Sequence, residues 1–412
     1  MLAWLLGVVL LLSFAGTVNE IILPSSVNLW ARVLRWPVLA ITAFFALTSI
    51  RVSQRSVRAI AWLASGMYAF TTVLYSVDLP ATVLRSVAFV ATVVGVFWGG
   101  RTLVMIREGT VVRLLTAGAT VCLALSAGGV VLQLAGVGEV FHLGTPLFCG
   151  LYVHPNTLGA VIPLWVPVAL FWLDHSRKRP WTRRLIASAL LLAAIALVQS
   201  KSRSGMGATV VGAVAYYLAT RRVGRLAGVG LVLLALGVLV GGLVPGVLGE
   251  ARDASAELVY KGRDDDVLGS RRDVMDGSTD NFMRSPWFGF GFGSSPGEVK
   301  GESEWKLVGL AGREKGNAYL ALLEEVGAVG TAVLTLPVAL FLLSWRRLVR
   351  MNRCGGTPRA AVAAAAWAGA FAGLVHNNGE ATLWSPGATF GAMLLLLAGV
   401  SDGILSHPDA RA

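Results

Sequence analysis

The chain has 412 residues, of which 55% are hydrophobic and 14% are charged, and its mean hydropathy is +0.68. Soluble domains carry about 25% charged residues, so this composition excludes an ordinary soluble protein. The net charge of +12 does not indicate nucleic-acid binding, because the basic residues form short clusters between apolar segments rather than one stripe. The three cysteines lie far apart and predict neither a disulfide framework nor a metal site.

Apolar segments of roughly the length that crosses a bilayer follow one another along the chain. They predict an all-α integral membrane protein with about twelve transmembrane helices and one long extracytoplasmic loop. The first segment has no basic residue ahead of it, so we expect a membrane anchor rather than a signal peptide. The predicted spans are residues 2–19, 36–50, 59–77, 84–100, 114–136, 150–173, 185–200, 204–220, 226–248, 317–345, 360–378 and 386–404.

Lysine and arginine alternate between the two sets of loops that these spans define. The loops after every second span are basic, whereas the short loops between them hold only Arg32, Arg35, Arg85, Lys201 and Arg203. By the positive-inside rule, the basic loops and both termini are predicted to be cytoplasmic. The chain then divides into spans one to nine (1–248), the long outer loop (249–316), and spans ten to twelve with a short tail (317–412).

Four short motifs lie on the predicted outer face. One of them, SKSRSG (200–205), is a tight turn between two spans that contains Lys201 and Arg203. A charge at this depth is costly and usually faces a cavity or a partner. The motifs are HPNTLG (154–159), SKSRSG (200–205), GSR (269–271) followed by SPWFGFG (285–291), and NAYL (317–320) followed by Glu325 and Gly327.

In this order and on this topology, the motifs resemble the O-antigen ligase and polymerase family of bacterial envelope enzymes, over roughly residues 60–400. The resemblance implies a GT-C-type glycosyltransferase in the cytoplasmic membrane of a bacterium. Such an enzyme passes a glycan from a polyprenyl-diphosphate carrier to an acceptor hydroxyl on a lipid, polysaccharide, protein or wall polymer. The resemblance also implies an inverting reaction on the outer face, without a metal or another cofactor.

A departing diphosphate needs cations, and arginine suits it best because its guanidinium binds two oxygens at once. We therefore assign Arg203 and Arg271 to the diphosphate, with Lys201 and Arg272 beside them. The alternatives are an interfacial anchor for Arg203 and Lys201, and surface salt bridges for the two loop arginines. The acidic triplet at 264–266 is predicted to be a solvated turn rather than a metal site.

Further substrate-binding candidates are His154, Asn156, Asn317, Tyr319 and Trp287. Trp287, and with it Trp305, would stack on the sugar. His154 and Asn156 have an alternative role, binding backbone carbonyls where a helix begins at Pro155. The glycine run at 289, 291 and 293 predicts a close-packed turn, because a phosphate-binding loop would follow a strand.

One residue departs from the family pattern. The family usually has a histidine, taken as the catalytic base, immediately before the asparagine of the fourth motif, and here that residue is Gly316. Glu314 is one replacement, since a carboxylate at the mouth of an apolar cavity can have a raised pKa. His376 at the outer end of the eleventh span is another, and the third alternative is no protein base. Glu325 is expected to make polar contacts inside the bundle.

Two other functions remain open from the sequence. A polysaccharide transporter or lipid flippase also suits twelve spans with a basic cavity, but no inverted repeat of broken helices is evident. A catalytically degenerate family member is the second alternative, and Gly316 is the residue that suggests it.

Overall fold

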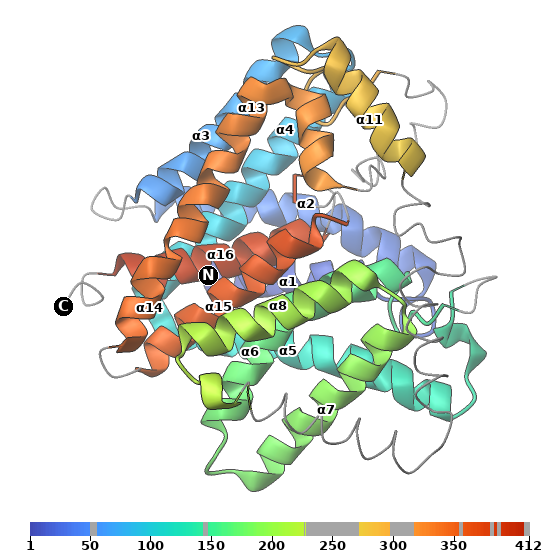
Figure 1. The fold of residues 1–412 in the computed structure, drawn as a ribbon, viewed down its shortest axis with the longest axis vertical. Coiled ribbons are helices and arrows are strands. Elements are labelled where there is room, and N and C mark those ends of the chain that lie inside the picture. The colour runs from blue at the N-terminus through green and yellow to red at the C-terminus, as the bar shows by residue number, and fades with distance from the viewer. Residues whose placement is uncertain are drawn as a thin grey trace.

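The structure is a computed structural model that describes residues 1–49, 56–142, 147–225, 227, 272–296, 317–353, 357–379, 383–384 and 389–407. Within these ranges the chain is helical and has no strand (Figure 1). Two isolated β-bridges, Val18 with Tyr152 and Phe141 with Phe148, join neighbouring loops. The described part therefore confirms the predicted all-α class.

The helices follow the predicted spans in chain order. Those of the first half are α1 (Leu2–Ala15), α2 (Ser25–Thr48), α3 (Val57–Thr71), η2 (Thr72–Tyr75), α4 (Leu79–Thr92), the π-helix η3 (Val93–Trp98), α5 (Gly99–Leu134) and η4 (Gly138–Val140). Those of the second half are α6 (Pro155–His175), α7 (Pro180–Gln199), α8 (Arg203–Ala219), α11 (Arg272–Arg284), α13 (Ala318–Leu343), α14 (Trp345–Arg353), α15 (Pro358–His376) and α16 (Thr389–Ser406).

Seven helical stretches of the described chain are long and apolar enough to cross a membrane. Two further apolar helices, Leu2–Ala15 and Phe390–Ser406, are shorter. The chain is thus a multi-pass membrane protein by the length and composition of its helices. The count of twelve spans stays a prediction, because the ninth, 226–248, lies almost entirely outside the described residues.

Helix α2 begins earlier than its predicted span. It starts at Ser25 rather than near 36, so Arg32 and Arg35 lie in the helix and not in a loop as expected. Arg32 donates from Nε to the carbonyl of Gly16 at 3.1 Å, just beyond the end of α1. A cation at a helix C-terminus is favourable, and this contact makes the polar start of α2 compatible with helix.

A second difference concerns residues 101–113, which the charge pattern predicts to be a loop. In the structure, α4, η3 and α5 form one continuous helical run, and only Arg107 departs from helical geometry (φ −151°, ψ 80°). Arg101 is buried and donates to Asp402 on α16 at 2.8 Å. Because a carboxylate neutralises this arginine inside the bundle, the polar segment does not have to leave the helix.

Polar contacts between the ends of the helices and their loops fall into two sets, one for each end of the bundle. At one end, Asp402 binds Arg58 and Arg101, and Arg359 pairs with Glu108 at 3.2 Å. All these arginines belong to the loops predicted to be cytoplasmic. In Figure 1, α14 and the C-terminal end lie at the left and α11 lies at the right.

At the other end, the predicted outer loops bind one another. The amide of Val153 donates to Thr17 at 2.9 Å, that of Val77 to Phe290 at 3.0 Å, and that of Ala318 to Asn377 at 3.0 Å. These contacts agree with the two loop sets that the charge pattern defines. Which set faces the cytoplasm remains a prediction.

Helices α6, α8 and α15 pack at very short range because small residues line their contacts. A methyl group on Gly369 of α15 would lie 2.3 Å from the carbonyl oxygen of Leu164 on α6. One on Gly212 of α8 would lie 2.7 Å from the Cβ of Ala372 on α15. Such small-residue packing is the usual way in which membrane helices approach one another. It fixes the positions of α6 and α8 relative to each other.

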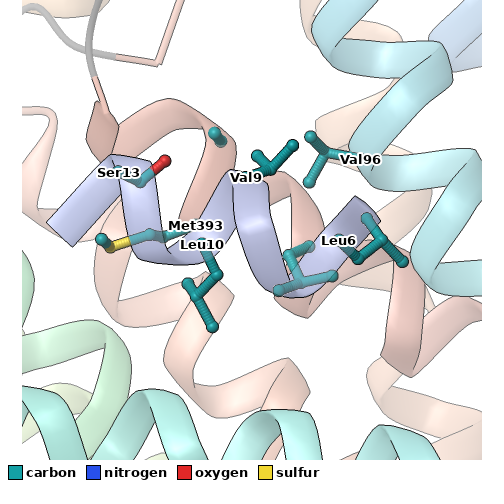
Figure 2. Close-up of a pocket in the computed structure, with 8 residues that line it drawn as sticks. Leu6, Val9, Leu10, Ser13, Val96 and Met393 are labelled. Carbon is teal, nitrogen blue, oxygen red and sulfur yellow. The ribbon is translucent and has the colours of Figure 1, made fainter. Parts of the chain in front are cut away.

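A small apolar pocket lies between α1, η3 and α16 (Figure 2). No titratable side chain lines it, and none of the four motifs contributes to it, so it is not the candidate site. Its lining residues are Leu6, Val9, Leu10, Ser13, Val96, Ala392, Met393 and Leu396.

Candidate functional site

The first two motifs meet at the amino-terminal ends of α6 and α8. A methyl group on Gly159 would lie 2.0 Å from Oγ of Ser202, and one on Gly205 would lie 2.6 Å from the carbonyl oxygen of Gly159. Both positions therefore need glycine for a direct backbone contact. Residues far apart in the sequence are thus brought into one junction, which we call the α6/α8 junction (Gly159, Ser202 and Gly205).

Arg203 is the first residue of α8 at this junction. The turn before it is tight: Ser200 ends α7, Lys201 adopts a left-handed conformation (φ 50°), and Ser202 precedes the helix. Lys201 and Arg203 are both half-buried, so their charges lie at the boundary of the bundle rather than in open solvent. The predicted turn between two spans is confirmed.

The amino-terminal ends of α6 and α8 lie together at the junction. Each helix start carries a partial positive charge, which favours a bound anion. At the start of α6 this is a dipole effect only, because Pro155 has no N–H and His154 accepts the amides of Asn156, Thr157 and Leu158. Arg203 and Lys201 add full positive charges at the same place. The arrangement suits an anionic group, and phosphate is the anion that helix starts and arginine bind best together.

His154 caps α6, but its partner is a backbone amide rather than the backbone carbonyl that the alternative interpretation expects. Its Nδ1 accepts a hydrogen bond from the amide of Asn156 at 3.1 Å, and Pro155 is the first helical residue. The ring of His142 lies 4.6 Å from that of His154, edge to face. His154 therefore positions the start of α6, and a direct contact with substrate, for it or for Asn156, stays a prediction.

The SPWFGFG motif docks on a break in α13. Gly327 has φ +64° and separates two parts of that helix, and the amides of Phe290 and Gly291 both donate to the free carbonyl of Glu325, at 2.9 and 2.8 Å. The Glu325 carboxylate accepts the amide of Gly293 at 2.8 Å. This confirms the polar packing role expected of Glu325.

The glycine run is a close-packed turn, as predicted. Gly289, Gly291 and Gly293 all have positive φ angles, and a methyl group on any of them would come within 2.5 Å of another atom. These glycines serve the docking of the loop on α13 and α4. Their backbone conformation and contacts explain them without a phosphate.

Trp287 follows directly after the point where this loop crosses α13. Its backbone contacts Gly327, but its side chain is 66% exposed. Phe288 beside it is also exposed, and its ring lies 6.1 Å from that of Tyr75. The indole ring is thus held on a fixed backbone with its surface open.

Asn317 and Tyr319 join the start of α13 to the end of α15. The Asn317 side chain accepts the amides of Tyr319 and Leu320 and donates to the carbonyl of Asn378 at 3.0 Å. The Tyr319 hydroxyl donates to the carbonyl of Leu374 at 3.0 Å. In the described structure both residues hold the two helices together, and their assignment to substrate binding stays a prediction.

His376, the last residue of α15, is fully buried. Its ring lies 5.5 Å from that of Phe390 on α16. The backbone carbonyl of the next residue, Asn377, accepts the amide of Ala318, so His376 lies near the start of α13.

Comparison with known proteins adds one finding. Residues 188–335 match the family model described as O-antigen ligase. Over this segment the chain is similar to O-antigen ligases. The match runs from α7 to α13 and includes the second, third and fourth motifs, whereas the first motif precedes it. No curated protein matches the chain.

Several residues that the sequence singles out lie outside the described residues. They are Arg271, Glu314, Gly316, Trp305 and the acidic triplet at 264–266. Arg272 is described as the exposed first residue of α11. Among the described residues, no group of three or more histidine, cysteine, aspartate or glutamate side chains is placed to hold a metal ion.

The sequence did not reveal two features of this region. One is the buried carboxylate of Glu324, which accepts from Asn281 of α11 at 2.9 Å and from Ser295, and so ties the loop to α13. The other is Arg85 of α4, which lies against Gly293. One feature of the sequence did point to Arg85, because it is one of the few basic residues expected on the outer face.

Proposed function

We propose that this O-antigen ligase-like chain is a glycosyltransferase that moves a glycan from a polyprenyl-diphosphate carrier to an acceptor hydroxyl on the outer face of the cytoplasmic membrane. The observation that carries the proposal is the α6/α8 junction. There two helix starts converge by direct glycine contact, with Arg203 and Lys201 on them. The family match supports the same class of reaction.

The proposed chemistry asks one main thing of these residues. When the bond between the anomeric carbon and the diphosphate breaks, the diphosphate oxygens gain negative charge. Arg203 donates two parallel N–H groups to them, and the starts of α6 and α8 add fixed dipoles. Positive groups placed where charge develops are often the largest contribution to catalysis. Arg271, from the loop, is proposed as the second arginine.

The loop that carries Arg271 and Arg272 is anchored at a defined place. Hydrogen bonds from Phe290, Gly291 and Gly293 to Glu325 fix the segment after α11 on α13. The exposed ring of Trp287 is proposed to stack on the glycan, because an open aromatic face on a rigid backbone suits a sugar ring. Asn317 and Tyr319 keep α13 against α15 and so preserve the base of the site.

The proposed general base is Glu314. It lies two residues before Gly316, where the family places its histidine. His376 is less suited, because its ring is fully buried beside Phe390. Glu314→Gln is therefore expected to lower the transfer rate more than His376→Gln at matched protein levels.

The proposal is tested with purified protein in detergent, a polyprenyl-diphosphate-linked glycan and an acceptor. A transferase makes a new glycosidic bond under these conditions, whereas a transporter or flippase makes none. Arg203→Ala is expected to reduce the rate by about a hundredfold, the order seen when one group that binds a developing charge is removed. Arg113→Ala, an exposed arginine at the opposite end of the bundle, is the control and is expected to be neutral. Full activity of a folded Arg203→Ala protein contradicts the proposal.

A further inference from the structure

Arg85, near the middle of α4, lies across the glycine turn. A methyl group on Gly293 would lie 2.3 Å from Cδ, 3.2 Å from Nη1 and 3.3 Å from Cβ of Arg85. The whole length of the side chain therefore runs along the backbone of this glycine. Any other residue at 293 would occupy the space that the arginine uses.

The turn beneath Arg85 is firmly held. The amide of Gly293 donates to the Glu325 carboxylate, and that of Phe292 donates to Oγ1 of Thr72 at 2.9 Å. The buried ring of Phe292 lies 5.4 Å from that of Phe89, one helical turn after Arg85 on α4. Arg85 thus rests on a fixed surface, and the direction of its side chain is set by packing rather than by an ion pair.

Within the described part of the chain, the guanidinium of Arg85 makes no hydrogen bond and no ion pair. At the opposite end of the bundle, Arg58, Arg101 and Arg222 each bind a carboxylate. The carboxylate in its own neighbourhood, that of Glu325, accepts the amide of Gly293 instead. A half-buried arginine within a membrane span carries a substantial cost unless an anion compensates it.

We propose that Arg85, held in place by Gly293, is a phosphate-binding site for a lipid headgroup in the outer leaflet. Arginine binds phosphate oxygens in pairs, and its long side chain can reach from within a span to the depth of the lipid phosphates. The site is separate in the fold from the α6/α8 junction, because α4 packs on α2, α3 and η3, whereas α8 packs on α6 and α15. It does not depend on glycan transfer.

Two lipids offer this chemistry, a glycerophospholipid such as phosphatidylglycerol and a polyprenyl diphosphate. The test uses the full chain in phosphatidylcholine nanodiscs, with one of these two lipids added in each arm. Native mass spectrometry then measures how much of the added lipid stays bound. Arg85→Gln is expected to weaken retention by about tenfold, which corresponds to the loss of one charge-assisted hydrogen bond.

Arg284→Gln is the matched control. Arg284 is an exposed arginine at the end of α11, and this substitution removes the same charge as Arg85→Gln. It is expected to behave like the wild type. Loss of retention at Arg85→Gln in either arm supports the site and shows which lipid it holds. Equal retention by both variants and the wild type overturns it, and so does an equal loss in both variants, which indicates general surface charge only.

Arg85→Lys guards against a folding defect, since it keeps the charge but not the paired donors. It is expected to retain more lipid than Arg85→Gln and less than the wild type. Equal values for the lysine and glutamine variants contradict recognition by charge.

Discussion

The substitution Gly159→Ala tests the geometry of the α6/α8 junction. The new methyl group would lie 2.0 Å from Oγ and 2.6 Å from Cβ of Ser202, whereas ordinary contact begins near 3.4 Å. The nearest pair is therefore about 1.4 Å too close (3.4 − 2.0), and the start of α8 has to move away. Overpacking of this kind costs about 1–3 kcal/mol. A misplacement of about 1 Å in a catalytic group lowers a rate by about a hundredfold.

The structure also provides a compensating change. Ser202→Gly removes both clashing atoms, and the next contact of the new methyl group is the Cα of Gly205 at 3.7 Å, an ordinary distance. Ser202 makes no side-chain capping hydrogen bond, so its replacement by glycine, itself accepted at helix starts, costs only a few tenths of a kcal/mol. The double variant is therefore expected to recover most of the transfer rate.

Gly205→Ala is the control that this change cannot rescue. Its methyl group would meet the backbone oxygen and Cα of Gly159 at 2.6 and 2.7 Å, which Ser202→Gly leaves in place. The assay is the transfer rate with purified protein, because alanine gains up to about 1 kcal/mol of helix propensity over glycine and so masks part of the strain in a melting curve. Full activity of Gly159→Ala, or rescue of Gly205→Ala by Ser202→Gly, refutes the reasoning.

Three further predictions follow from single contacts. Glu325→Gln weakens the bond to the Gly293 amide by the difference between a charged and a neutral acceptor, about 1 kcal/mol, and is expected to speed proteolysis of the loop. Asp402→Asn leaves the buried Arg101 without its carboxylate, and is expected to cost about 3–5 kcal/mol, seen as a lower melting temperature. Burial raises the pKa of the Cys149 thiol, so its maleimide labelling near neutral pH, followed by mass spectrometry of the peptide, is expected to be slower than that of a free cysteine and to rise only at higher pH. An unchanged cleavage rate, an unchanged melting temperature, or labelling at the rate of a free thiol contradicts the respective prediction.

The helices of the bundle were largely predictable, because apolar length and alternating charge are local properties of a membrane chain. The start of α6 at Pro155 and the turn at Lys201 also followed from local signals. The start of α2 and the helical run through Arg101 did not. In each case a distant group, the Gly16 carbonyl or the Asp402 carboxylate, satisfies an arginine that otherwise reads as a loop residue.

The candidate site was predictable in composition but not in contacts. The motifs named the residues, yet nothing in the chain shows that Gly159 touches Gly205, or that Gly327 breaks α13 to receive the SPWFGFG segment. Those contacts depend on how the helices pack. The role of Arg85 is hidden for the same reason, since its slot is made by a glycine on a separate segment.

The central claim is that the cations at the starts of α6 and α8 hold the diphosphate of a lipid-linked donor. An experimental structure of the full chain with a polyprenyl diphosphate bound tests it most directly. We expect diphosphate oxygens within hydrogen-bonding distance of the Arg203 guanidinium, beside the α6/α8 junction. A diphosphate bound elsewhere, with Arg203 directed into the lipid, would contradict the account.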